Sequence, residues 1–159
     1  MNPLLPLLRD DQIVLDADVR DREQLFRMAA DLLAARHGLH GQDVFQALLA
    51  REKLGSTGMG WGIAIPHARM PQISHAASAY IRTREPIAFG APDGKPVSHF
   101  LVLLVPKEAN ERHLQLMAAA AGILSDPAVR RDLGRCSRCE DVRNRVAAWD
   151  DSKPGVSDG

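Results

Sequence analysis

A run of six consecutive apolar residues, Phe100 to Val105, restricts the fold of this chain more than any other feature of its sequence. A strand with one face in water alternates apolar and polar residues, whereas a strand covered on both faces is apolar throughout. Segments with helical periodicity lie on both sides of this run along the chain. The sequence therefore predicts an α/β fold, a three-layer α/β/α sandwich with helices on both faces of a sheet. A length of 159 residues fits one such domain with a substantial core.

The N-terminal half carries one strand signal and two helix signals. Residues 12–15 indicate a short strand. Asp21, followed three residues later by Gln24, is typical of a helix N-cap, and apolar residues then recur at helical spacing until Gly38. A second helix is predicted over residues 43–53.

The C-terminal half continues the alternation of strands and helices. Strands are predicted at 77–83 and from Val97 onward, with a turn at Asp93-Gly94 between them. A long helix is expected over residues 108–124, and Asp126-Pro127 starts a short one. Ser137-x-x-Glu140 has the pattern of a capping box that opens the last helix. Residues 150–159 are polar and rich in Pro, Gly and Ser, so we expect a disordered tail.

Composition excludes several classes of protein. Twenty Lys and Arg balance twenty Asp and Glu, which argues against nucleic acid or an anionic membrane surface as a partner. The apolar runs are too short for membrane insertion, and residues 1–8 lack the basic start of a signal peptide. Two cysteines are too few for a secreted disulfide scaffold. We therefore expect a cytoplasmic protein.

A glycine-dense loop precedes the first candidate site residue, His67. Gly58, Gly60 and Gly62 leave backbone N–H groups unobstructed, and successive N–H groups can converge on an oxyanion. A neutral histidine beside such a loop is suited to receive a phosphoryl group. The loop matches neither a P-loop nor a dinucleotide fingerprint. A tight connection that merely needs glycine, with His67 an incidental surface residue, remains an equal alternative on spacing alone.

His113 is the second candidate. It lies at the N-terminal end of the apolar stripe of the long predicted helix, where partial burial and the helix dipole favour a neutral imidazole. Such a group could serve as a hydrogen-bond partner. The alternative, a histidine at the edge of the core bonded to a backbone carbonyl, is favoured before further information.

Other reactive residues carry weaker signals. Cys136-x-x-Cys139 links two predicted helices, so two ordinary thiols are favoured over a redox pair, although Cys139 would lie in the first turn of a helix. His37, His40, His75 and His99 form no recognisable constellation. Four methionines are predicted to be packing residues rather than ligands: Met28, Met59, Met70 and Met117.

Residues 51–67, REKLGSTGMGWGIAIPH, resemble the active-site signature of the fructose/mannitol-type IIA domains of the bacterial phosphoenolpyruvate-dependent phosphotransferase system. Within this family the chain most resembles the stand-alone, nitrogen-type regulatory proteins. The similarity continues through 91–97, 100–106 and 113–118, and it covers roughly residues 5–149. The resemblance implies one IIA domain over residues 1–149, with a mixed sheet between two helical layers.

The resemblance also assigns roles to residues. His67 matches the phospho-accepting histidine, which takes its phosphoryl group from an HPr-like phosphocarrier. His113 matches the supporting histidine of the active site, and Arg51 matches the active-site arginine, whose guanidinium would offset phosphoryl charge. Two residues depart from the family pattern. Trp61 stands where relatives usually carry a polar side chain, and Ala68 replaces the usual glycine after the histidine.

These observations predict a phosphocarrier that uses no cofactor and no metal. Its further partners would be regulatory targets such as transporters or kinases. Three alternatives stay open: a stand-alone sugar-transport IIA component, a regulator that binds its partner independently of phosphorylation, and a metal site formed by His67 and His113. Trp61 is predicted either to contact a partner or to fold over the loop.

Overall fold

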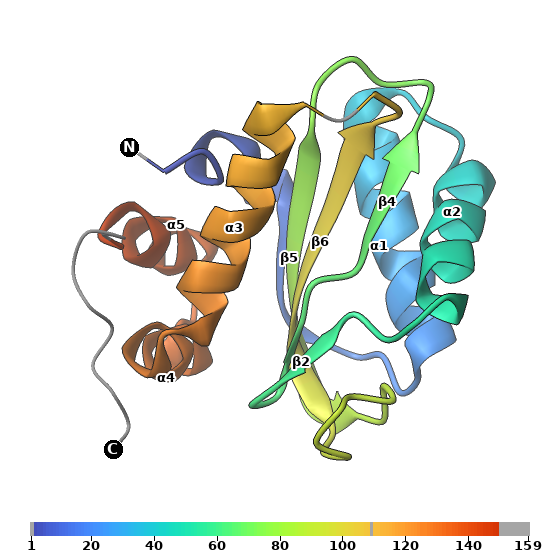
Figure 1. Cartoon of the computed structure of the whole chain (residues 1–159). Coiled ribbons are helices and arrows are strands. Elements are labelled where there is room, and N and C mark those ends of the chain that lie inside the picture. The colour runs from blue at the N-terminus through green and yellow to red at the C-terminus, as the bar shows by residue number, and fades with distance from the viewer. Residues whose placement is uncertain (1, 109, 150–159) are drawn as a thin grey trace.

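The computed structural model describes residues 2–108 and 110–149, which form a six-stranded mixed sheet between two layers of helices (Figure 1). The predicted three-layer sandwich is confirmed. Residues 150–159, predicted to be a disordered tail, lie outside the described residues. The elements in chain order are the short 3-10 helices η1 (Leu5–Leu7) and η2 (Asp10–Gln12), then β1 (Ile13–Ala17), α1 (Arg22–His37), α2 (Gly41–Lys53), β2 (Gly58–Gly60), β3 (Ile63–Ala64), β4 (His67–Met70), β5 (Ala77–Ile87), β6 (Val97–Pro106), α3 (Glu111–Ser125), α4 (Pro127–Arg135) and α5 (Cys139–Ala147).

The predicted buried strand, β6, lies inside the sheet. The strand order is β1-β5-β6-β3-β2, and β4 also pairs with β6 beyond the end of β3. β5 is antiparallel to β6, whereas β3 and β4 are parallel to it, and β1 is parallel to β5. The residues from Phe100 to Leu104 are at most 2% exposed, as a strand covered on both faces requires.

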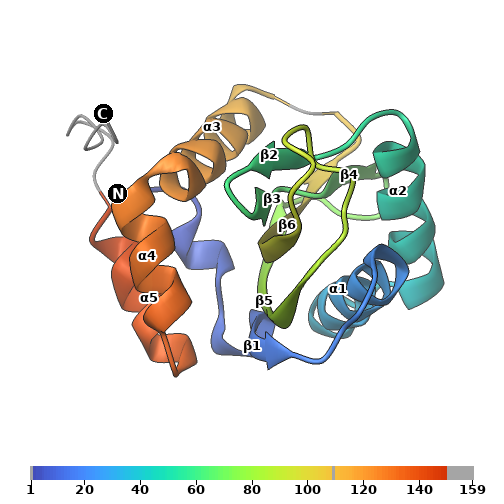
Figure 2. The ribbon, with the colours of Figure 1, turned by 90° about the horizontal axis from the view of Figure 1, so that it is seen from below.

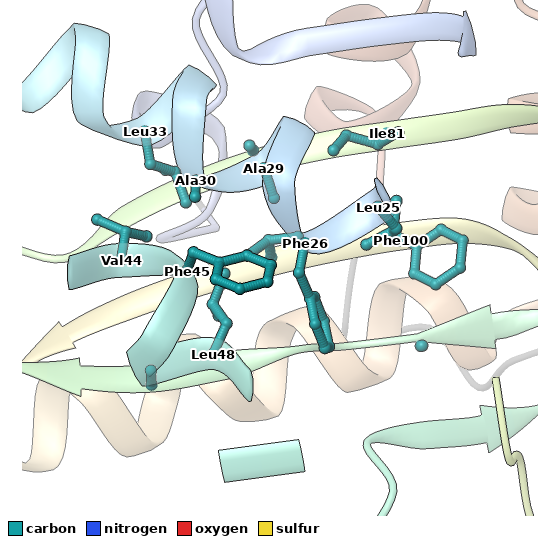
Figure 3. Packing of buried hydrophobic residues seen from close by; sticks show 14 of the residues in the cluster. Leu25, Phe26, Ala29, Ala30, Leu33, Val44, Phe45, Leu48, Ile81 and Phe100 are labelled. Atoms are coloured by element: carbon teal, nitrogen blue, oxygen red, sulfur yellow. The ribbon is translucent and has the colours of Figure 1, made fainter. Parts of the chain in front are cut away.

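One face of the sheet is covered by α1 and α2. The Asp21 side chain accepts the Gln24 N–H at the start of α1, and Gly38, with a φ of 66°, ends the helix as predicted. α2 begins at Gly41, two residues before its predicted start. Phe26 of α1 and Phe45 of α2 point into the layer between these helices and the sheet, which also contains Phe100 (Figure 3).

The other face is covered by α3, α4 and α5 (Figure 2). α3 begins at Glu111, three residues later than predicted, because the Asn110 side chain accepts the His113 N–H and so caps the helix there. Asp126 and Pro127 start α4 as predicted. The capping box predicted at Ser137 and Glu140 is wrong by one residue.

The carboxylate of Asp141, rather than Glu140, satisfies the free amides before α5. Asp141 Oδ2 accepts the N–H groups of Ser137 at 3.3 Å and Arg138 at 3.2 Å, and Arg138 is the N-cap. The sequence offered two acidic residues at neighbouring positions, and the three-dimensional course of the chain decided between them. Cys139 lies in the first turn of α5, as predicted.

The glycine-dense segment is a hairpin and not only a loop. β2 and β3 are antiparallel, and the turn between them is Trp61-Gly62. β3 and β4 together form one interrupted strand along β6, and at the interruption the Leu103 N–H donates to Pro66 O at 2.9 Å. Because β2 flanks only the β3 half, the half that begins at His67 is an open edge of the sheet.

In the part of the chain that the structure describes, no helix has both the length and the apolar character needed to cross a lipid bilayer.

Candidate active site

His67 is the first residue of β4 and lies opposite Leu103 of β6. Paired residues on neighbouring strands point to the same face of a sheet. Leu103 belongs to the core on the α3 side, whereas the next pair, Ala68 and Leu104, belongs to the core on the α1 and α2 side. The His67 side chain is therefore directed toward the α3 side of the sheet edge, where it is half-buried.

The His67 ring is bonded through both of its nitrogens. Nδ1 lies 2.9 Å from Ile65 O, and Nε2 lies 3.3 Å from Arg51 Nε. A carbonyl oxygen only accepts and a guanidinium nitrogen only donates. Nδ1 therefore carries the ring proton, and Nε2 presents its lone pair. This is the tautomer in which Nε2 is the nucleophile.

Arg51 reaches His67 from the last turn of α2, and 16 positions separate the two residues in sequence. Its Nη1 donates to Gly55 O at 2.8 Å, so the guanidinium is anchored by the loop that follows the helix. A cation in the last turn of a helix is stabilised by the helix dipole. The structure thus brings together two of the three residues to which the sequence assigned a role in the reaction.

His113, the third, lies in the first turn of α3 and is half-buried. Its Nδ1 accepts the backbone N–H of Asn110 at 3.0 Å, so in the neutral ring the proton is on Nε2. The predicted alternative, a histidine bonded to a backbone carbonyl, does not apply, because its backbone partner is a donor. His113 and His67 both lie near the carboxyl end of β6, but among the described residues no hydrogen bond joins His113 to His67 or Arg51.

The β2–β3 hairpin determines how far Gly58, Gly60 and Gly62 lie from His67. The carbonyl of Gly62 accepts the N–H groups of Ser98 and His99, and His99 is four residues before Leu103. At about 3.3 Å per residue, this end of the hairpin lies about 13 Å along β6 from the row of His67. The structure therefore does not bring Gly60 and Gly62 to His67, and phosphate binding by the glycines stays a prediction.

Each of these glycines has a structural explanation. Gly60 and Gly62 have φ values of 87° and 76°, which favour glycine. A Cβ on Gly58 would lie 2.9 Å from the Ala91 Cβ, so the backbone of β2 approaches the 91–95 turn too closely for a side chain.

Trp61 occupies the tip of the hairpin and is 63% exposed. Its φ of 55° is in the left-handed region, and its N–H donates to Asp93 Oδ2 at 3.2 Å. The guanidinium carbon of Arg130 lies 5.2 Å from the ring centroid, within the range of a cation–π contact. The ring therefore stands out from the loop beside α4 instead of folding over it. Ala68, the other departure from the family pattern, is buried in the core.

Sequence reasoning missed a buried pair behind Arg51. Glu52 is 4% exposed and Thr57 is 7% exposed, and the two carboxylate oxygens of Glu52 accept the N–H and the hydroxyl of Thr57. A glutamate in the last turn of an amphipathic helix gives no signal that it is buried. The five-residue spacing could have suggested the pair only if the course of the loop had been known.

The remaining candidates lie apart from His67. His99 is bonded to the Tyr80 hydroxyl on the α3 side of the sheet, a partnership that the sequence did not indicate. The thiols of Cys136 and Cys139 have separate partners, Asp132 O and Ile13 O, and burial raises the pKa of Cys136. Over residues 2–108 and 110–149, no three His, Cys, Asp or Glu side chains gather into a metal-binding group.

Comparison with known proteins decides the family. Residues 6–148 match the model of the phosphoenolpyruvate-dependent sugar phosphotransferase system, EIIA 2. The chain belongs to this EIIA family. It is 35% identical over 136 residues to a nitrogen regulatory protein of Bradyrhizobium diazoefficiens, which covers 86% of this chain and 88% of the relative. It is also 38% identical over 101 residues to a fructose-specific EIIA component of Haloferax volcanii, covering 64% and 66%.

A solved structure agrees with this assignment. The crystal structure of the nitrogen regulatory protein IIA-Ntr from Neisseria meningitidis is 45% identical, covers 90% of this chain and 98% of its own, and superposes with a TM-score of 0.86. Within the EIIA family, the chain is thus similar to the nitrogen regulatory proteins.

Proposed function

We propose that this chain is a phosphocarrier that accepts a phosphoryl group on His67 Nε2 from an HPr-like phosphohistidine protein. The observation that carries the proposal is the bonding of the His67 ring, which leaves the Nε2 lone pair at the sheet edge beside Arg51. Membership of the EIIA family supports the chemistry, since its members are phosphocarriers.

In the proposed step, the Nε2 lone pair attacks the phosphorus of the carrier's phosphohistidine. The N–P bond of the carrier breaks, and its electron pair stays on the nitrogen of the leaving ring. His67 retains its proton on Nδ1 and becomes positively charged, and the Ile65 carbonyl, which accepts that proton, stabilises this charge.

Arg51 has two functions in this step. Before transfer, its Nε–H holds Nε2; during transfer, the same N–H group is free to donate to the phosphoryl oxygens while Nη1 stays on Gly55 O. Catalysis of this kind depends on positioning and charge stabilisation more than on covalent help from the protein. The Nε2–H of His113 would supply a second donor to the phosphoryl group.

Exposed apolar side chains beside the site support a protein as the phosphoryl donor. Leu54, which directly follows α2 and lies three residues after Arg51, is 86% exposed, and Leu114, next to His113, is 69% exposed. Large apolar residues at such exposure are typical of a protein interface when they surround a functional residue.

Two alternatives make different predictions. A metal site at His67 is disfavoured, because the guanidinium of Arg51 would repel a cation at Nε2. A sugar-transport role is kept as a second candidate because of the similarity to a fructose-specific component. Growth on the sugar would then require His67, whereas a regulatory role would make a target protein respond to the phosphorylation state.

The deciding experiment is intact-mass spectrometry after incubation with phosphoenolpyruvate, enzyme I and an HPr-like carrier at mildly alkaline pH. We expect one phosphoryl group on the wild type, none on His67→Ala, and uptake slowed by about 100-fold in His113→Ala, within the range for loss of one donor. An unmodified wild type in the presence of phosphorylated carrier would contradict the proposal. A regulator independent of phosphorylation would instead keep its effect on its target in His67→Ala.

A further inference from the structure

A buried carboxylate lies directly behind the arginine of the site. Glu52 Oε1 accepts the Thr57 N–H at 2.9 Å, and Glu52 Oε2 accepts the Thr57 hydroxyl at 2.6 Å. Burial of a carboxylate is strongly unfavourable unless its oxygens are hydrogen-bonded. Thr57 supplies a donor to each oxygen, and these two hydrogen bonds fix the loop of residues 54–56, which connects α2 to Thr57.

Thr57 is also bonded to the strand segment that leads to His67. Its carbonyl accepts the Ile65 N–H at 3.1 Å, and the Ile65 carbonyl in turn holds His67 Nδ1. The side chain of Thr57 is therefore connected to the helix that carries Arg51, and its backbone is connected to the residue that orients His67.

The contacts form a closed ring. From His67 Nε2 the ring runs to Arg51, through the peptide bond to Glu52, across the carboxylate to Thr57, then to Ile65 and back to His67 Nδ1. The loop that the pair encloses also contains Gly55, whose carbonyl anchors Arg51 Nη1. The hydroxyl of Thr57 belongs to a side chain that does not touch His67, so a substitution of Thr57 can remove this contact without changing Arg51 or His67.

We propose that Thr57 is a positioning residue for phosphoryl transfer. It acts through Glu52 and Ile65 to hold the Arg51 guanidinium and the His67 imidazole in their relative orientation. This inference rests on the proposed function of His67. The Thr57 side chain itself contacts Glu52, not His67 or Arg51.

Thr57→Val tests the proposal because it keeps the shape of the side chain and removes the hydroxyl. Glu52 Oε2 then loses its buried donor, and the loop that anchors Arg51 shifts. We expect the single-turnover rate of transfer from saturating phosphorylated HPr-like carrier to fall about 10- to 100-fold, with the half-saturating carrier concentration unchanged, since small misplacements in an active site have effects of this order. Thr57→Ser, which keeps the hydroxyl, is expected to retain a rate within about threefold of the wild type.

The matched control is Thr83→Val. Thr83, in β5, is also a buried threonine, at 4% exposure, but its hydroxyl has no hydrogen-bond partner among residues 2–108 and 110–149 and lies outside the ring. Its substitution is expected to leave the transfer rate unchanged. If Thr57→Val does not fold, Thr57→Ala, which removes the hydroxyl without adding volume, replaces it.

A readout that does not depend on transfer is the ¹⁵N NMR spectrum of the His67 ring. We expect the unphosphorylated wild type and Thr57→Ser to show protonated Nδ1 and unprotonated Nε2, and Thr57→Val to show a mixture of the two neutral tautomers. A folded Thr57→Val variant that has the wild-type transfer rate and the wild-type ¹⁵N chemical shifts of the His67 imidazole would overturn the positioning role, even if the wild type accepts phosphate. Conversely, a wild type that takes no phosphate would contradict the proposed function, while the ring spectra would still decide whether Thr57 orients His67.

Discussion

At the scale of single residues, the buried pair of Tyr80 and His99 has a definite consequence for stability. The Tyr80 hydroxyl lies 2.6 Å from His99 Nδ1, and burial raises the pKa of Tyr80, so the hydroxyl is the donor and the neutral imidazole is the acceptor. Burial, with smaller contributions from the charges of Arg82 and Arg130, lowers the pKa of His99 to about 4. A protonated His99 would lose its acceptor nitrogen beside two cations.

This pair predicts a loss of stability in acid. The unfolded chain binds a proton on His99 near its ordinary pKa of 6.5, and the folded chain does so only near 4. Between these values the unfolded state binds more protons, so the free energy of unfolding falls as the pH falls from about 6.5 toward 4, by about 3 kcal/mol in all. Urea unfolding at a series of pH values measures this slope.

His99→Gln is the control for that prediction. The amide can accept a hydrogen bond from Tyr80 and does not titrate. The free energy of unfolding of the variant is therefore expected to fall less between pH 6.5 and 4 than that of the wild type. The pKa of His37 is also lowered by burial, and that contribution is common to both proteins. Parallel pH profiles for the two would refute the assignment to His99.

At the scale of elements, the β2–β3 hairpin is defined by close approach and by positive φ angles. Gly58→Ala would bring a methyl group to 2.9 Å from the Ala91 Cβ, and the hairpin would have to move away from the 91–95 turn. We expect a loss of about 1–3 kcal/mol in the free energy of unfolding, as is usual for overpacking. Thermal or urea unfolding of the purified variant measures it.

A glycine-to-alanine substitution in α4 is expected to stabilise the fold, in contrast to the same substitution in the hairpin. An added Cβ on Gly134 meets nothing within 4 Å, and alanine is preferred over glycine in a helix. Gly134→Ala should raise the free energy of unfolding by about 0.5–1 kcal/mol. Equal effects of the two substitutions would show that the hairpin is not packed as tightly as the structure has it.

At the scale of the whole molecule, Arg82 of β5 ties the α4–α5 layer to the sheet. Its Nη1 donates to the carbonyls of Leu133 and Cys136 at the end of α4, and its Nη2 lies 3.3 Å from Asp16 Oδ1. Its side chain is only 11% exposed. Asp16 has a φ of 55°, at the irregularity where β1 changes register against β5.

Arg82→Ala is therefore expected to destabilise the fold by about 2–3 kcal/mol, because the charge-assisted hydrogen bonds from one buried guanidinium to two carbonyls are lost. Arg84→Ala, two residues along the same strand, removes an exposed ion pair to Asp18 at 4.0 Å and should change stability by less than about 0.5 kcal/mol. Urea unfolding of both variants makes the comparison. Similar losses would contradict the role of Arg82.

The accuracy of the sequence-based predictions follows the range of the interactions involved. The apolar run of β6 predicted a strand covered on both faces, and Asp21, Gly38 and Pro127 predicted helix ends that the structure has, because the partner in each case lies within a few residues. The start of α3 was predicted three residues too early, and the cap of α5 was misplaced where the neighbouring Glu140 and Asp141 could each supply the carboxylate.

The family motif indicated the site, but its geometry needed distant partners. Arg51 and His67 were assigned by resemblance, whereas their 3.3 Å contact depends on the packing of α2 beside β4. Glu52 and Thr57, like Tyr80 and His99, carry no local pattern that predicts their pairing, because each pair is made by the path of the chain between them.

The sequence by itself thus determined the layers and the main helix ends, and it indicated the histidine and the arginine of the candidate site, since these follow from local periodicity, capping and a continuous motif. Only the tertiary structure decided that the glycine-dense segment is a hairpin whose tip lies far from His67. It also decided which nitrogen of His67 presents its lone pair, because that depends on Ile65 on one side of the ring and on Arg51, from another element, on the other.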